Sequence, residues 1–241
     1  MLAREMPDPD GSCCRGAFLG RAAATGAAAL GMLVPLRISA APQAGAGVSA
    51  DVALARLMNG NHVFVEAMAG TRAQTIAERA ALGAGQAPWA SILTCADSRL
   101  APEIIFNAGL GDIFVARVAG NVADPAETAS LEYGSAVLGS QLIVVMGHSS
   151  CGAVQSTIDA ASGKKMPSRD LERLVAAIMP AVKSVSGKPG NELVNATKAN
   201  VLANVYHLQA NALLKELGSQ GKLRIVGAYY DLASGKVSLL T

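Results

Sequence analysis

Residues 141–154, QLIVVMGHSSCGAV, decide the fold prediction. Residues 141–147 are dominated by Leu, Ile and Val, which is typical of a strand buried on both faces. His148 follows this run directly, and Cys151 stands three residues later, where the next helix is expected to open. The stretch therefore predicts a strand, a turn and a helix, with a His-x-x-Cys pair in the turn.

Four further segments are predicted as strands: WASILT (89–94), DIFVARV (112–118), LRIVGAYYD (223–231) and KVSLL (236–240). The turn LASG joins the last two as a hairpin. The helical spacing of apolar residues and the Pro-acid starts predict helices at 51–68, 102–107, 125–138, 168–186 and 191–217.

This short alternation of strands and helices favours a mainly parallel sheet that is covered on both faces. We predict a single α/β domain over residues 42–241, with four parallel strands, an antiparallel edge strand, flanking helices and an N-terminal helical arm. The chain is long enough to bury a full core of this kind.

Residues 1–41 differ in composition from the rest of the chain. Arg15 and Arg21 precede an apolar stretch, Ala22–Val34, which the small residues ISAAP follow. This order predicts a cleaved export signal, since a spanning helix needs about 20 apolar residues. The segment is similar to a twin-arginine signal, with Cys14 in place of the first arginine. We expect export to a bacterial periplasm; a cytoplasmic protein with an N-terminal extension is the alternative.

The charge and hydropathy patterns indicate which kinds of partner the chain does not suit. The net charge is +2, and the Lys and Arg residues are scattered instead of forming a basic stripe, which argues against nucleic-acid binding. Residues 50–241 hold no run of apolar residues that predicts a membrane span, so no stable membrane insertion is expected after processing.

Cys95 follows the strand 89–94 in the same way as His148 follows the strand 141–147. In open α/β sheets, sites form outside the carboxyl ends of the strands. Cys95, His148 and Cys151 make a Cys₂His set that suits zinc, and three protein ligands leave the open fourth position of a catalytic site. The alternatives are that Cys95 is a small buried side chain, that His148 is a turn residue, or that the two cysteines form a disulfide or redox pair.

CADSR (95–99) together with HSSCGA (148–153) resembles the signature of the beta-class carbonic anhydrases. The likeness covers about residues 50–241. It continues through GQAP (85–88), FVARVAGN (114–121), SLEYGSAVLG (130–139), LIVVMGHSSCGAV (142–154) and VGAYYDLASGKV (226–237). The resemblance implies reversible hydration of carbon dioxide to bicarbonate and a proton, with one Zn²⁺ per chain on the two cysteines and the histidine.

The resemblance also assigns roles around the zinc. Hydroxide formed from a zinc-bound water would be oriented toward CO2 by Asp97, and Arg99 would hold Asp97 ionised and away from the metal. Family members that bicarbonate inhibits have Trp three residues before the first Cys, where this chain has Ile92; its only Trp is Trp89. We therefore expect an open site rather than one closed by Asp97.

The expected substrate pocket consists of Gln86, Phe114, Tyr133 and the backbone at Gly152, with Tyr133 supplied by a partner subunit in a homodimer or a dimer of dimers. An apolar wall with one amide donor suits a small linear substrate. Phe114 and Tyr133 could instead be core residues.

Three other functions stay open at this point. The same site could hydrolyse carbonyl sulfide or carbon disulfide, the zinc could stabilise an interaction module without turnover, or the cysteines could do thiol chemistry. Asp97 and Arg99 argue against the interaction module, because a structural zinc needs no group that orients a nucleophile. His62 and His207 are expected to be packing or surface residues.

Overall fold

The computed structural model describes residues 47–66 and 75–240. The predicted export signal over residues 1–41 lies outside these ranges. Within them, none of the helices combines the length and the apolar character that crossing a membrane requires.

The centre of the fold is one sheet of five strands in the order β2-β1-β3-β4-β5. The first four strands are parallel, and β5 pairs antiparallel with β4. The predicted sheet of four parallel strands and an antiparallel edge strand is thus confirmed. The bounds are β1 (Ala90–Thr94), β2 (Ile113–Arg117), β3 (Leu142–His148), β4 (Arg224–Tyr230) and β5 (Val237–Leu240).

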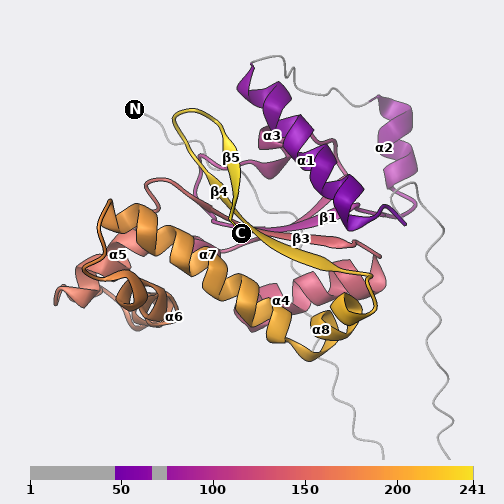
Figure 1. Cartoon of the computed structure of the whole chain (residues 1–241). Coiled ribbons are helices and arrows are strands. Elements are labelled where there is room, and N and C mark those ends of the chain that lie inside the picture. The colour runs from indigo at the N-terminus through magenta and orange to yellow at the C-terminus, as the bar shows by residue number, and fades with distance from the viewer. Residues whose placement is uncertain (1–46, 67–74, 241) are drawn as a thin grey trace, which may run out of the picture. The chain divides into compact units, whose positions relative to one another are not determined.

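Helices cover both faces of this sheet. Figure 1 shows α1 and α3 on one face and α4, α7 and α8 on the other. The helices are α1 (Ala50–Val65), α2 (Ile76–Leu82), α3 (Pro102–Ile105), α4 (Pro125–Glu132), α5 (Gly152–Ala161), α6 (Arg169–Val185), α7 (Glu192–Ala210) and α8 (Ala212–Ser219), with short turns η1 (Ala119–Asn121) and η2 (Tyr133–Val137). Because both faces are covered, β1 and β3 are buried along their whole length.

Two helix predictions need correction. The helix α2 was not expected, although Thr75 and Glu78 cap it reciprocally, the side chain of each accepting a hydrogen bond from the backbone of the other. The segment predicted as one helix over 191–217 is two helices. Asn211 separates them because its side chain accepts a hydrogen bond from Leu214 N at 3.1 Å and so starts α8.

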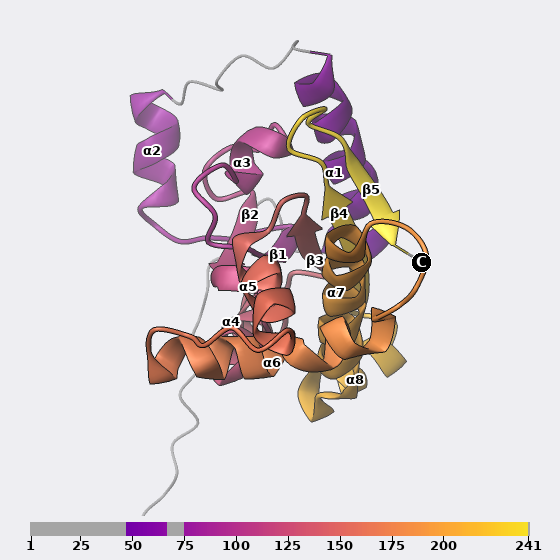
Figure 2. The same cartoon turned by 90° about the vertical axis from the view of Figure 1, so that its left-hand side faces the viewer.

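The order of the strands makes the connections diverge between β1 and β3. The chain leaves β1 toward β2 and leaves β3 toward β4, so the two connections diverge from neighbouring strands. In Figure 2, the strands follow one another from β2 to β5, with α2 on the β2 side. Thr94 is in register with Met146, which places Cys95 and His148 at adjacent strand ends. This is the place where open parallel sheets build their sites.

Gly147 lets α7 pack closely against the end of β3. A Cβ atom at this position would lie 2.6 Å from Val201 Cγ2 and 3.0 Å from Thr197 Cγ2, both on α7. A larger residue therefore fits only if these side chains, the helix or the strand shift. The next residue of that strand is His148.

Candidate metal centre

Three side chains predicted as metal ligands converge at the carboxyl ends of β1 and β3. Cys95 directly follows β1, His148 is the last residue of β3, and Cys151 is the N-cap residue of α5. Their ligand atoms all lie within 4.8 Å of one another, and the three residues are buried. We call Cys95, His148 and Cys151 the ligand group. The structure thus brings Cys95 to a His148–Cys151 pair that lies more than fifty positions later in the sequence.

The hydrogen bonding of His148 fits a metal ligand. Its Nδ1 lies 2.9 Å from the carbonyl oxygen of Ser149, so Nδ1 carries the proton and donates it. The lone pair is then on Nε2, which is buried and has no hydrogen-bond partner among the described residues. Such an orphaned acceptor is unfavourable unless something else satisfies it. Cys95 and Cys151 are both free thiols, so the donor set is two sulfurs and one imidazole, which suits zinc.

The two sulfurs shift each other's pKa. The pKa of Cys95 is lowered, chiefly by the neighbouring Cys151 and also by His148 and by the hydrogen bond from the backbone N–H of Gly120. The pKa of Cys151 is raised, because it lies beside Cys95 and is buried. Backbone N–H groups at the start of α5 lower the pKa of Cys151, but Cys95 outweighs them. A divalent metal bound to both sulfurs would favour the thiolate form of each.

Asp97 and Arg99 form a bidentate ion pair in the turn after β1. Arg99 Nε donates to Asp97 Oδ1 at 2.8 Å and Arg99 Nη2 donates to Asp97 Oδ2 at 2.6 Å. The backbone N–H of Arg99 adds a third hydrogen bond to Oδ1, at 2.9 Å. The Arg99 side chain is the main cause that holds the pKa of Asp97 well below its ordinary value. Asp97 is therefore an ionised acceptor at neutral pH.

This carboxylate lies beside the ligand group. Asp97 Oδ2 is 3.9 Å from His148 Nε2, and Arg99 Nη2 also donates to the carbonyl oxygen of Ser150 at 3.2 Å, between the histidine and Cys151. Arg99 thus ties the turn after β1 to the turn after β3, and both oxygens of Asp97 are engaged by its guanidinium.

Arg117, which the sequence analysis did not single out, supports the same turn. It is the last residue of β2, and its guanidinium donates to the carbonyl oxygens of Cys95 at 3.1 Å and Asp97 at 2.7 Å. Its signal in the sequence is weak, because an arginine at a strand end identifies no partner until the strand register is known.

The residues predicted for the substrate pocket are more dispersed. Gly152 is the first residue of α5, next to Cys151, and open space lies where its Cβ would be. Gln86 is exposed in the loop that enters β1, whereas Cys95 is at the exit of that strand. Phe114 on β2 and Tyr133 on η2 are in ring contact, with centroids 6.3 Å apart. Their assignment to substrate binding stays a prediction.

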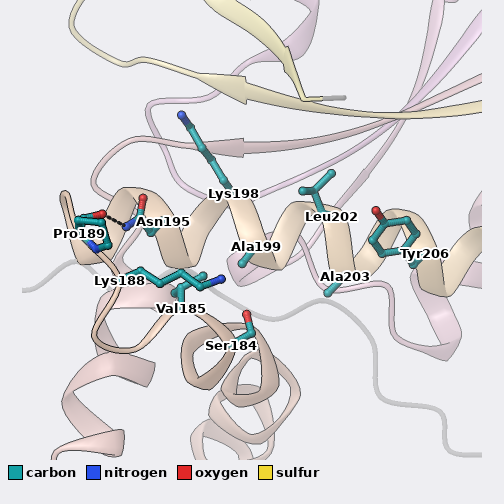
Figure 3. A pocket seen from close by; sticks show the side chains of 10 residues that line it. All are labelled: Ser184, Val185, Lys188, Pro189, Asn195, Lys198, Ala199, Leu202, Ala203 and Tyr206. Atoms are coloured by element: carbon teal, nitrogen blue, oxygen red, sulfur yellow. Dashed lines mark hydrogen bonds between the residues drawn. The ribbon is translucent and has the colours of Figure 1, made fainter.

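His62 and His207 are both exposed, on α1 and α7. A separate hollow lies between α6 and α7 (Figure 3). Its volume is about 610 Å³, and its lining includes Val185, Leu202 and Tyr206 but no member of the ligand group. The hollow is therefore not part of the metal centre.

Comparisons with known proteins agree with this geometry. A family model described as carbonic anhydrase matches residues 90–237. A carbonic anhydrase of Mycolicibacterium smegmatis is 40% identical over 185 residues, which cover 76% of this chain and 89% of the relative. Carbonic anhydrase 2 of Mycobacterium tuberculosis is 39% identical over 184 residues, again 76% of this chain and 89% of the relative.

The fold is also similar to that of a solved beta-carbonic anhydrase. A tetrameric beta-carbonic anhydrase of Sordaria macrospora superimposes with a TM-score of 0.63 at 22% identity, over 78% of this chain and 96% of that chain. The sheet and the site thus define an α/β protein with a Cys₂His group that could hold a metal ion. The chain belongs to the beta-carbonic anhydrase family.

Proposed function

We propose that this protein is a zinc-dependent enzyme that interconverts CO2 and bicarbonate, with Cys95, His148 and Cys151 as the zinc ligands. The observation that carries the proposal is the convergence of three buried ligand atoms within 4.8 Å, beside an ionised carboxylate that an arginine holds at both oxygens. When bound, zinc supplies a Lewis acid that lowers the pKa of water toward neutrality.

Asp97 is the group that orients the nucleophile. An ionised carboxylate only accepts hydrogen bonds, so Asp97 would accept one from the proton of the attacking hydroxide. This leaves a lone pair of the hydroxide oxygen directed at the carbon atom of CO2. Two side-chain hydrogen bonds from Arg99 fix the direction of this carboxylate beside the ligand group. A zinc that only stabilises an interaction module has no use for such a pair.

A second copy of the chain completes the substrate pocket in this proposal. Gln86 precedes β1 while Cys95 follows it, so one chain presents the two at opposite ends of the strand. Tyr133 is 45% exposed and contacts Phe114 on the edge strand β2, and Ile104 is 54% exposed on α3, in the connection between β1 and β2. A homodimer packed along this edge would bury these side chains and would offer Gln86 and Tyr133 to the ligand group of its partner.

Stopped-flow CO2 hydration by the full-length chain tests the proposal, with the metal content measured on the same sample. We expect about one zinc per chain, loss of turnover after chelation, and recovery when zinc is returned. Turnover by metal-free protein, or none by zinc-loaded protein, would refute it. Faster turnover of carbonyl sulfide than of CO2 would assign the alternative reaction to this site.

A further inference from the structure

The helix α7 buries two asparagine side chains against the body of the fold. Asn200 is 1% exposed and Asn204 is 8% exposed, and their spacing of four residues places them on the same face of the helix. A different face of α7, with Lys198, Leu202 and Tyr206, lines the hollow in Figure 3. A buried amide is unfavourable unless its donors and acceptor are satisfied, so the partners of these two side chains show what they hold.

Both amides bind the segment that follows β2. Asn200 Nδ2 donates to the carbonyl oxygen of Gly120 at 2.7 Å. Asn204 Oδ1 accepts from Ala123 N at 2.7 Å, and its Nδ2 donates to the carbonyl oxygen of Asn200 at 2.8 Å. Residues 120–123 are therefore anchored to α7 at both ends by buried hydrogen bonds.

The other side of Gly120 contacts the ligand group. Its backbone N–H donates to Cys95 Sγ at 3.2 Å. Gly120 has φ 70° and ψ 15°, a left-handed conformation that favours glycine, and a Cβ there would lie 2.6 Å from Ile178 Cδ1. Glycine rotates more freely than any other residue, so the direction of its N–H depends on what holds the adjoining peptide. The hydrogen bond from Asn200 supplies that anchor.

We propose that Asn200 is a positioning residue of the metal centre, which fixes Gly120 so that its N–H stays directed at the sulfur of Cys95. A hydrogen bond to a thiolate withdraws electron density from the sulfur, and groups that orient metal ligands tune both affinity and electronic structure. The inference rests on metal binding by the ligand group but not on CO2 hydration, so the two can fail separately.

The test uses the full-length protein with cobalt(II) in place of zinc, because the sulfur-to-cobalt charge-transfer band reports the electron density on the thiolates. Asn200→Ala and the nearly isosteric Asn200→Asp both remove the donor to Gly120. We expect the band to move to lower energy in both variants, and zinc affinity, measured by competition with a chelator, to fall about 10- to 100-fold.

Asn61 provides the matched control. It is 3% exposed, donates to the carbonyl oxygens of Ile105 and Gly235, and accepts from Val237 N, so its hydrogen bonds reach neither the ligand group nor Gly120. Asn61→Ala should lower stability and leave the charge-transfer band where it is. An unshifted band in the Asn200 variants, or an equal shift in Asn61→Ala, would overturn the proposal.

A measurement on the unmutated protein covers the case in which the Asn200 variants do not fold. Cadmium-113 bound to the ligand group should show a scalar coupling to the amide proton of Gly120, transmitted through the hydrogen bond to Cys95 Sγ. Absence of this coupling would overturn the proposal, because Asn200 would then have no directed N–H to maintain.

Discussion

Replacing Arg99 with alanine separates orientation of the nucleophile from metal binding. Arg99→Ala removes two of the three hydrogen bonds that Asp97 receives from Arg99 and keeps the third, from the backbone N–H. The pKa of Asp97 then returns toward its ordinary value of 3.8, which is still far below neutral pH. The carboxylate therefore stays charged but loses its direction.

Loss of a group that orients a reacting residue typically costs about 10- to 100-fold in activity, and we expect a decrease of this size in kcat/KM for CO2 hydration. Zinc content should not change, because Arg99 is not a ligand. Thermal stability should change little, because the Arg99 side chain is 52% exposed and the pair is screened by solvent. Stopped-flow hydration, metal analysis and thermal unfolding of one sample measure all three quantities.

The exposed ion pair between Arg173 and Asp170, with a distance of 2.9 Å, is a matched control on α6. Arg173→Ala removes an arginine–carboxylate pair outside the metal centre whose arginine is 68% exposed, against 52% for Arg99, so it should hydrate CO2 at the parent rate. If Arg99→Ala also does so, the reasoning about Asp97 is refuted.

Three further predictions concern the ligands, the packing and the response to acid. Cys151→Ser should lose both zinc and CO2 hydration, and full metal occupancy in this variant would contradict its assignment as a ligand. Gly147→Ala should lower the free energy of unfolding by about 1–3 kcal/mol, since overpacking costs this much. The new Cβ would lie 2.6 Å from Val201 Cγ2. An unchanged denaturation midpoint would contradict this prediction, because it would show that the residues around the new Cβ move aside without loss of stability. Because folding lowers the pKa of Asp97 below 3.8, the ionised carboxylate stabilises the fold above that pH and this stabilisation is lost as the pH falls toward the folded pKa. The stability difference between the wild type and Asp97→Asn should therefore shrink on acidification, and a difference independent of pH would argue against the lowered pKa.

The sequence predicted the ligand group because its chemistry is local. Cys95 and His148 each follow an apolar strand, and the carboxyl ends of neighbouring parallel strands must meet at one edge of the sheet. The roles of Asp97 and Arg99 came from the resemblance to the family, and their ion pair lies within one turn.

The roles of residues that depend on long-range contacts could not be predicted from the sequence. The helical spacing of α7 identified its apolar positions, but it could not show that Asn200 meets Gly120, eighty positions earlier. Arg117 likewise gains its role only from the pairing of β1 with β2. The helix α2 was missed although Thr75 and Glu78 carry the capping signal, because the segment has no buried residue and so no apolar periodicity.

X-ray absorption at the zinc edge counts the atoms bound to the metal and so tests the ligand assignment. We expect a shell of two sulfur atoms at about 2.3 Å together with nitrogen or oxygen atoms at shorter distance. A shell without sulfur, or one made of sulfur alone, would contradict the assignment of Cys95, His148 and Cys151 as the ligands of an open catalytic zinc.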